Sequence, residues 1–172
     1  MTHIVLSGKH SAEKTAMIRR LLNAAARPVY GFVTQKLPPA PDGFHPVYLH
    51  PAAQTSRAYR TENLVGICNR REQRVHPEVF DTLGVSLIEQ AKPDGILVMN
   101  ELGFMEANAA AFCRTVLAAL DGEIPILAAI KERSDIAFLQ QIRAHPNVLL
   151  CSLNDDEEAL FARLRPIVQN YE

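Results

Sequence analysis

The chain has 172 residues, enough for one domain with a sizeable core. A formal net charge of −1, 6% aromatic residues and no Trp provide neither a basic field nor stacking platforms, so we expect no nucleic-acid partner. We also expect a cytoplasmic protein with free thiols and no membrane partner, because Met1 leads directly into a strand-like run, no long apolar stretch follows, and the cysteines lack CxxC spacing.

Strand-like and helix-like segments alternate along the chain. Short apolar runs are typical of strands buried on both faces, and an apolar residue every three or four positions is typical of a helix packed on a core. In chain order these patterns predict strand 4–6, helix 13–26, a hairpin over 29–51, helix 76–91, strand 95–103, helix 108–122, strand 124–132, helix 135–145, strand 147–153 and helix 155–169. We therefore predict a single α/β domain over residues 1–172, with a parallel sheet covered by helices on both faces.

The hairpin is the antiparallel part of this prediction. Residues 29–37 are rich in β-branched and aromatic side chains, segment 38–43 contains the turn residues Pro, Asp and Gly, and 44–51 is the return strand. Prolines flank and interrupt the hairpin, which favours an edge of the sheet. Residues 52–74 are polar and irregular, with a further strand expected at 64–67.

The segment between the first strand and the first helix has nearly the layout of a phosphate-binding loop. That motif reads G-x-x-x-x-G-K-[S/T]; its backbone N–H groups hold phosphates, its lysine reaches the β- and γ-phosphates, and its hydroxyl binds Mg²⁺. Gly8, Lys14 and Thr15 stand at the required spacing. The expected phosphate-binding residues are therefore Gly8, Lys9, His10, Ser11, Ala12, Glu13, Lys14 and Thr15.

Glu13 occupies the position of the motif's second glycine. A glycine there lets the backbone approach the phosphates, whereas a carboxylate near a polyphosphate is repelled. Two unit charges about 4 Å apart cost on the order of 4 kcal/mol at an effective dielectric of about 20. The alternative interpretation is an ordinary helix N-terminus, where an acidic residue in the first turn is favourable.

A second polar pair lies in the strand predicted at 95–103. A buried strand that ends in an acidic pair is the Walker B arrangement, in which the first acid holds the Mg²⁺ shell and the next residue orients the attacking water. Here the first position is Asn100 and the second is Glu101. We predict Thr15 and Asn100 as magnesium residues, in a site weakened because Asn brings no charge, and Glu101 as the catalytic base. A polar pair that caps the following turn is the alternative.

The two motifs together resemble those of the cancer-related nucleoside-triphosphatase family of P-loop proteins. That family's second motif reads D-E-I-G-x-M-E-L, and the chain has NELGFMEA, which keeps Glu101, Gly103, Met105 and Glu106 in order. The similarity extends over nearly the whole chain, through YGFVTQK, IPILAAIKERS and NVLLCSLNDDEEAL. The resemblance implies a P-loop NTPase-type sheet, phosphates held by residues 8–14, and slow Mg²⁺-dependent hydrolysis of ATP, GTP and other nucleoside triphosphates.

Four departures from the family pattern all weaken affinity for a Mg²⁺-bound triphosphate. Glu13 replaces a glycine and Asn100 replaces an aspartate. The family's N-R-D near the last strand is NDD at 154–156, and the hairpin, basic in the family, has Lys36 as its only Lys or Arg. The missing arginine and the sparsely basic hairpin remove positive charge, Glu13 adds negative charge, and Asn100 removes a charge from the magnesium shell.

Three functions are compatible with these residues. The first is a nucleoside-triphosphate-binding protein that hydrolyses its ligand slowly with Mg²⁺. The second is an inactive relative that uses the fold to bind nucleotide, phosphate, a protein partner or a second copy of itself. The third is a small nucleoside or nucleotide kinase, for which the sequence shows no acceptor site. The cations left to stabilise transferring charge are Lys131, Arg133 and the arginines of 70–74, for each of which a solvated surface position is the ordinary interpretation.

Overall fold

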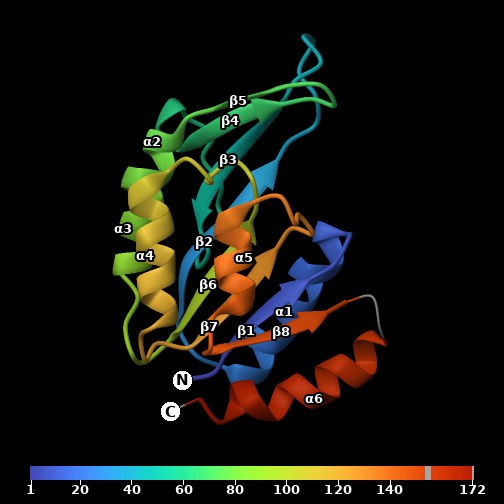
Figure 1. Ribbon diagram of the computed structural model, residues 1–172, viewed down its shortest axis with the longest axis vertical. Helices are drawn as coiled ribbons and strands as arrows, with labels where there is room; N and C mark the ends of the chain where they lie inside the picture. Colours follow the sequence, from blue (N-terminus) through green and yellow to red (C-terminus); the bar gives the residue numbers. More distant parts are fainter. Residues whose placement is uncertain (154–155, 172) are drawn as a thin grey trace.

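The computed structural model describes residues 1–153 and 156–171, and within them the strands form one eight-stranded sheet (Figure 1). The strands are β1 (His3–Ser7), β2 (Val29–Lys36), β3 (His45–Pro51), β4 (Leu64–Cys68), β5 (Gln73–Val75), β6 (Ile96–Leu102), β7 (Ile126–Ile130) and β8 (Val148–Ser152). Their order is β5-β4-β3-β2-β6-β7-β1-β8. The pairs from β2 to β8 along this order are parallel, and the pairs from β5 to β2 are antiparallel.

Helices cover both faces of the sheet, as Figure 1 shows. One face carries α1 (Ser11–Ala25) and α6 (Glu157–Gln169). The other carries α2 (Pro77–Val79), the π-helical turn η2 (Phe80–Gly84), α3 (Val85–Glu89), α4 (Ala110–Leu120) and α5 (Ala137–Ala144), and the short turn η1 (Thr61–Asn63) precedes β4. None of the helices in the described part of the chain is both long and apolar enough to cross a bilayer.

The central strands are apolar on both faces because a helical layer covers each face. In β1, Ile4 and Leu6 belong to the core layer that contains Met17 and Leu21 of α1, whereas Val5 belongs to the opposite layer. All of them are at most 1% exposed. The carboxyl ends of β1, β6 and β7 therefore emerge side by side from a rigid core, next to the N-terminus of α1.

In the opposite core layer, η2 packs closely against α4. A Cβ atom added at Gly84 would lie 2.8 Å from ring atoms of Phe112, so only glycine fits at this point of the turn. Phe112 also packs against Phe32 of β2 and Phe80 of η2, with ring centroids 5.5 and 5.2 Å apart. This cluster of three rings fixes the position of η2 against the sheet.

The α/β class and the predicted alternation of strands and helices are confirmed. The antiparallel part lies at one side of the sheet as expected, but β4 and β5 continue it beyond the hairpin, so the edge strand there is β5 and the hairpin itself is internal. Strand β5 was not predicted, because its three residues are mostly exposed and polar. Helix α1 begins at Ser11 rather than at Glu13. Residues 154 and 155, within the segment where the family's arginine is replaced, lie outside the described residues.

Candidate functional site

Lys14, the lysine of the phosphate-binding motif, is held inside the protein. Its side chain is 1% exposed, although it lies in the first turns of α1. Its Nζ donates hydrogen bonds to the carbonyl oxygens of Gly8 and Ile130, at 2.7 and 3.1 Å, and lies 2.7 Å from Oε2 of Glu101. Two hydrogen bonds and one ion pair thus surround the ammonium group of Lys14.

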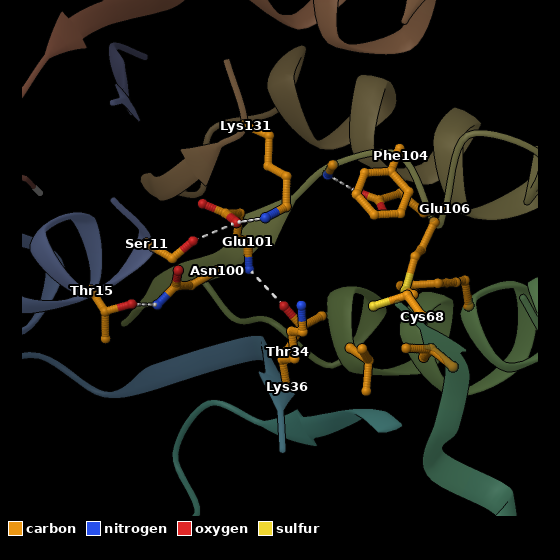
Figure 2. Close-up of a pocket in the computed structure, with 15 residues that line it drawn as sticks. Ser11, Thr15, Thr34, Lys36, Cys68, Asn100, Glu101, Phe104, Glu106 and Lys131 are labelled. Atoms are coloured by element: carbon orange, nitrogen blue, oxygen red, sulfur yellow. Dashed lines mark hydrogen bonds and ion pairs between the residues drawn. The ribbon is translucent and has the colours of Figure 1, made fainter. Parts of the chain in front are cut away.

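Glu101 is the centre of the charged cluster. It lies at a β-bulge near the end of β6 and is 8% exposed. Its Oε1 accepts a hydrogen bond from Ser11 Oγ at 3.0 Å and lies 2.8 Å from Nζ of Lys131, as Figure 2 shows. Burial acts to raise the pKa of Glu101, but Lys131 and Lys14 outweigh it and hold that pKa below its ordinary value. Glu101 is thus a carboxylate neutralised by lysines on both oxygens.

Thr15 and Asn100 contact each other beside this cluster. Asn100 is 6% exposed, and its Nδ2 donates a hydrogen bond to Thr15 Oγ1 at 3.0 Å. Among the described residues, no three His, Cys, Asp or Glu side chains gather as a metal site. Mg²⁺ needs oxygen ligands and is often bound through one or two carboxylates together with substrate phosphates. A hydroxyl and a neutral amide oxygen therefore fit a magnesium ion that arrives on phosphates, but not one that the protein holds alone.

The connection between β1 and α1 is short. β1 ends at Ser7 and α1 begins at Ser11, so residues 8–10 form the whole loop. The side chain of His10, at the N-cap, makes no capping hydrogen bond, and the first N–H groups of a helix have no partner within it. Glu13 lies half-buried in the first turn. The backbone here is thus a helix N-terminus, which attracts anions, rather than a long glycine-rich cradle.

Two hollows meet at the charged cluster. The first, which we call the basic cleft, has a volume of about 280 Å³ and is lined by Gly8, Lys9, Ser11, Lys14, Lys131, Glu132 and Arg133. The second, which we call the inner cavity, has a volume of about 320 Å³. Ser11 and Lys131 line both of them, and the Lys14–Glu101 ion pair joins a residue of the cleft to a residue of the cavity.

The inner cavity has one polar end and one mostly apolar end. Figure 2 shows Ser11, Thr15, Asn100 and Glu101 at the polar end. The apolar lining residues of the cavity are Val47, Val65, Cys68, Phe80, Phe104 and Met105, and Figure 2 shows Cys68 and Phe104 on the side away from Thr15. Glu106 lies there too, and it accepts a hydrogen bond from the N–H of Gly103. Because Glu106 is fully buried, desolvation raises its pKa to about 7.

The structure brings together the main residues that the motifs single out, namely Lys14, Thr15, Asn100 and Glu101. Lys131 is the residue that sequence reasoning undervalued, because its usual position would be a solvated surface. It is 40% exposed and yet pairs with Glu101. The available signal was its place directly after β7, since ligands bind at the carboxyl ends of parallel strands.

The other cations are less central. Arg133 pairs with Asp135 through two contacts of 2.7 and 2.6 Å, and its guanidinium lies 5.6 Å from the ring centroid of Phe104. Arg74 pairs with Glu72 at 2.9 Å and lines neither hollow. Thr34 of β2 was also missed: its Oγ1 accepts the backbone N–H of Glu101 at 3.2 Å, which ties the site to the hairpin.

The pKa of Glu106 predicts a pH effect on stability. Its pKa is raised from 4.5 to about 7, so between these values the folded chain binds more protons than the unfolded chain, and this contribution falls as pH rises. Between about pH 4.5 and pH 7, the wild type should lose roughly 3 kcal/mol of stability relative to Glu106→Gln. Urea unfolding at several pH values measures this difference. Parallel curves for the two proteins would contradict it.

Comparisons with known proteins agree with this fold. A family model described as NTPase matches residues 3–163. The crystal structure of THEP1 from the hyperthermophile Aquifex aeolicus is similar, with a TM-score of 0.71 and 16% identity over 98% of this chain and 100% of that one. The solution structure of a human cancer-related nucleoside triphosphatase is also similar, with a TM-score of 0.68 and 20% identity over 100% of both chains. A search of curated proteins finds no match. The family match confirms the resemblance drawn from the two motifs, and the chain belongs to the NTPase family.

Proposed function

We propose that the chain binds a nucleoside triphosphate, with its phosphates in the basic cleft, and hydrolyses it slowly with Mg²⁺. The observation that carries this proposal is the meeting of Lys14, Lys131 and Glu101 at the carboxyl ends of adjacent strands, beside a helix N-terminus. The name of the human structural neighbour, a nucleoside triphosphatase, supports the same activity.

Phosphate binding must displace an existing interaction. Lys14 already has three partners, so a phosphate oxygen gains this lysine only by replacing one of them. Glu101 Oε2 is the partner that a more highly charged anion replaces most readily, because the two carbonyls belong to the fixed backbone. Lys9, which is exposed in the same cleft, adds a charge that needs no such exchange. Nucleotide affinity is therefore reduced by competition from Glu101 as well as by repulsion from Glu13.

The same exchange activates Glu101. While Lys14 and Lys131 both contact it, its lowered pKa makes it a weak base. Once phosphates draw Lys14 away from Glu101, one of the two lysines that lower the pKa of Glu101 is lost. The effect of burial then raises that pKa. It can then accept a proton from a water molecule placed at the mouth of the inner cavity. A magnesium ion held by Thr15, the Asn100 oxygen and the phosphates would neutralise phosphate charge. Weak binding and a base that is active only in part both favour slow turnover.

Calorimetric titration tests the binding itself. ATP and GTP should bind in the presence of Mg²⁺, and Lys9→Ala should weaken binding by about threefold to tenfold, because it removes an exposed cation from the cleft. Arg70→Ala is the matched control, since this exposed residue lines neither hollow. Absence of binding heat at millimolar nucleotide would refute the proposal.

Glu13 provides a second test, in which charge and backbone are separated. Glu13→Gln keeps a good helix former and removes the charge, so it should tighten nucleotide binding about tenfold. Glu13→Gly should tighten it further by freeing the first turn, at a cost of about 1 kcal/mol in helix stability. The affinities come from the same titration. If only the glycine variant binds more tightly, the repulsion account is wrong, and if neither does, Glu13 lies outside the phosphate path.

Glu101→Gln should separate binding from hydrolysis. The amide cannot hold the lysines as ion pairs, so both become available to phosphate and affinity should rise by roughly tenfold. Phosphate release should fall by at least about a hundredfold, because general-base catalysis is lost. A malachite-green assay beside the titration measures both effects, and circular dichroism checks the fold. Undiminished turnover in this variant would remove Glu101 from its catalytic role.

A further inference from the structure

The inner cavity is larger than hydrolysis requires. A water molecule has a share of liquid volume of about 30 Å³, whereas the cavity measures about 320 Å³. That volume falls in the range of small-molecule sites, and its lining has the usual character of such sites, with apolar and aromatic walls and a few convergent polar groups. The cavity therefore has room for a small molecule beside the attacking water.

The polar end and the apolar end of the inner cavity suit the polar part and the apolar part of a single ligand. Phe104, which is partly exposed, contributes aromatic surface on the side of the cavity away from Thr15, where a flat ring can stack. Glu106, which also lies there, is protonated in part at neutral pH because of its burial, so it presents both a hydrogen-bond donor and an acceptor. Such a group pairs with the adjacent donor and acceptor atoms on the edge of a nucleobase.

The opposite end of the cavity is lined by the carboxylate of Glu101, which would activate a hydroxyl. Glu101 lines the cavity and forms an ion pair with Lys14 of the basic cleft, and Lys131 belongs to both hollows. A triphosphate in the cleft and a ligand in the cavity would therefore meet at Glu101 and Lys131. This is the arrangement that direct transfer between two substrates requires.

We propose that the inner cavity is a second substrate site, which binds a nucleoside and presents its hydroxyl as a phosphoryl acceptor. The inference rests on the proposed function, because the triphosphate in the basic cleft is the phosphoryl donor. The hydroxyl oxygen forms a bond to the γ-phosphorus while the bond from that phosphorus to the β–γ bridging oxygen breaks. Glu101 takes the hydroxyl proton and releases it to water. The products are a phosphorylated nucleoside and a nucleoside diphosphate. When no nucleoside occupies the inner cavity, water attacks instead and the triphosphate is hydrolysed as a side reaction.

Binding is tested first, without any triphosphate. Equilibrium dialysis of the full chain against adenosine, guanosine, cytidine, uridine and thymidine should show at least one that binds. Phe104→Ala should weaken that binding about tenfold or more by removing the stacking surface, while circular dichroism and urea unfolding check that the variant stays folded. Leu150→Ala, at an exposed position of β8, is the control. Absence of binding by all five nucleosides at about 10 mM, or binding that Phe104→Ala leaves unchanged, overturns the assignment.

Transfer is tested next, with MgATP and the nucleoside that binds. ADP should form in excess of free phosphate, and the difference should equal the phosphorylated nucleoside found by chromatography. Equal amounts of ADP and phosphate with a bound nucleoside overturn the acceptor role. If ATP itself does not bind, the proposed function falls and the transfer step falls with it. The dialysis result then still decides whether the cavity holds a nucleoside, so the two failures are distinguishable.

Discussion

The ion cluster of Lys14, Glu101 and Lys131 is the interaction on which the rest of the site depends. A carboxylate that is 8% exposed is costly unless it is paired, and here each of its two oxygens faces the ammonium group of a lysine. The cluster also ties three parts of the fold together, since its members come from α1, from the end of β6 and from the residue after β7. In the proposed function, an anion that enters the basic cleft competes with Glu101 for the same lysines, so its affinity and the chemistry would be coupled through the Lys14–Glu101 ion pair.

Glu13 has a structural role that partly explains why a glycine is absent. Glutamate is a better helix former than glycine by up to about 1 kcal/mol, and its charge is favourable in the first turn. The observed start of α1 at Ser11 is consistent with both effects. The loop before the helix is correspondingly short. Glu13 stabilises the helix, but the short loop offers less backbone to an anion. The residue therefore affects both the backbone and the electrostatics of the motif.

Much of the architecture could be predicted from the sequence, and the site only in part. Buried strands and helices have patterns of fixed period, and the two motifs identify Lys14 and Glu101 by spacing. The position of Lys131 depends on which strands are neighbours, and strand order is a property of the whole chain. The burial of Lys14 was unexpected for a similar reason, because its partners Gly8, Ile130 and Glu101 come from three separate strand ends. The short polar strand β5 has no apolar pattern from which it could be recognised.

Phe80 belongs both to the ring cluster with Phe112 and to the wall of the inner cavity. The shape of the inner cavity therefore depends on how η2 packs against α4, and Gly84 makes this packing possible. A change of side-chain volume anywhere in this cluster would be transmitted to the cavity wall, because close-packed interiors cannot absorb it locally. The range of molecules that the cavity admits can thus be altered through the hydrophobic core, while every charged residue of the site stays in place.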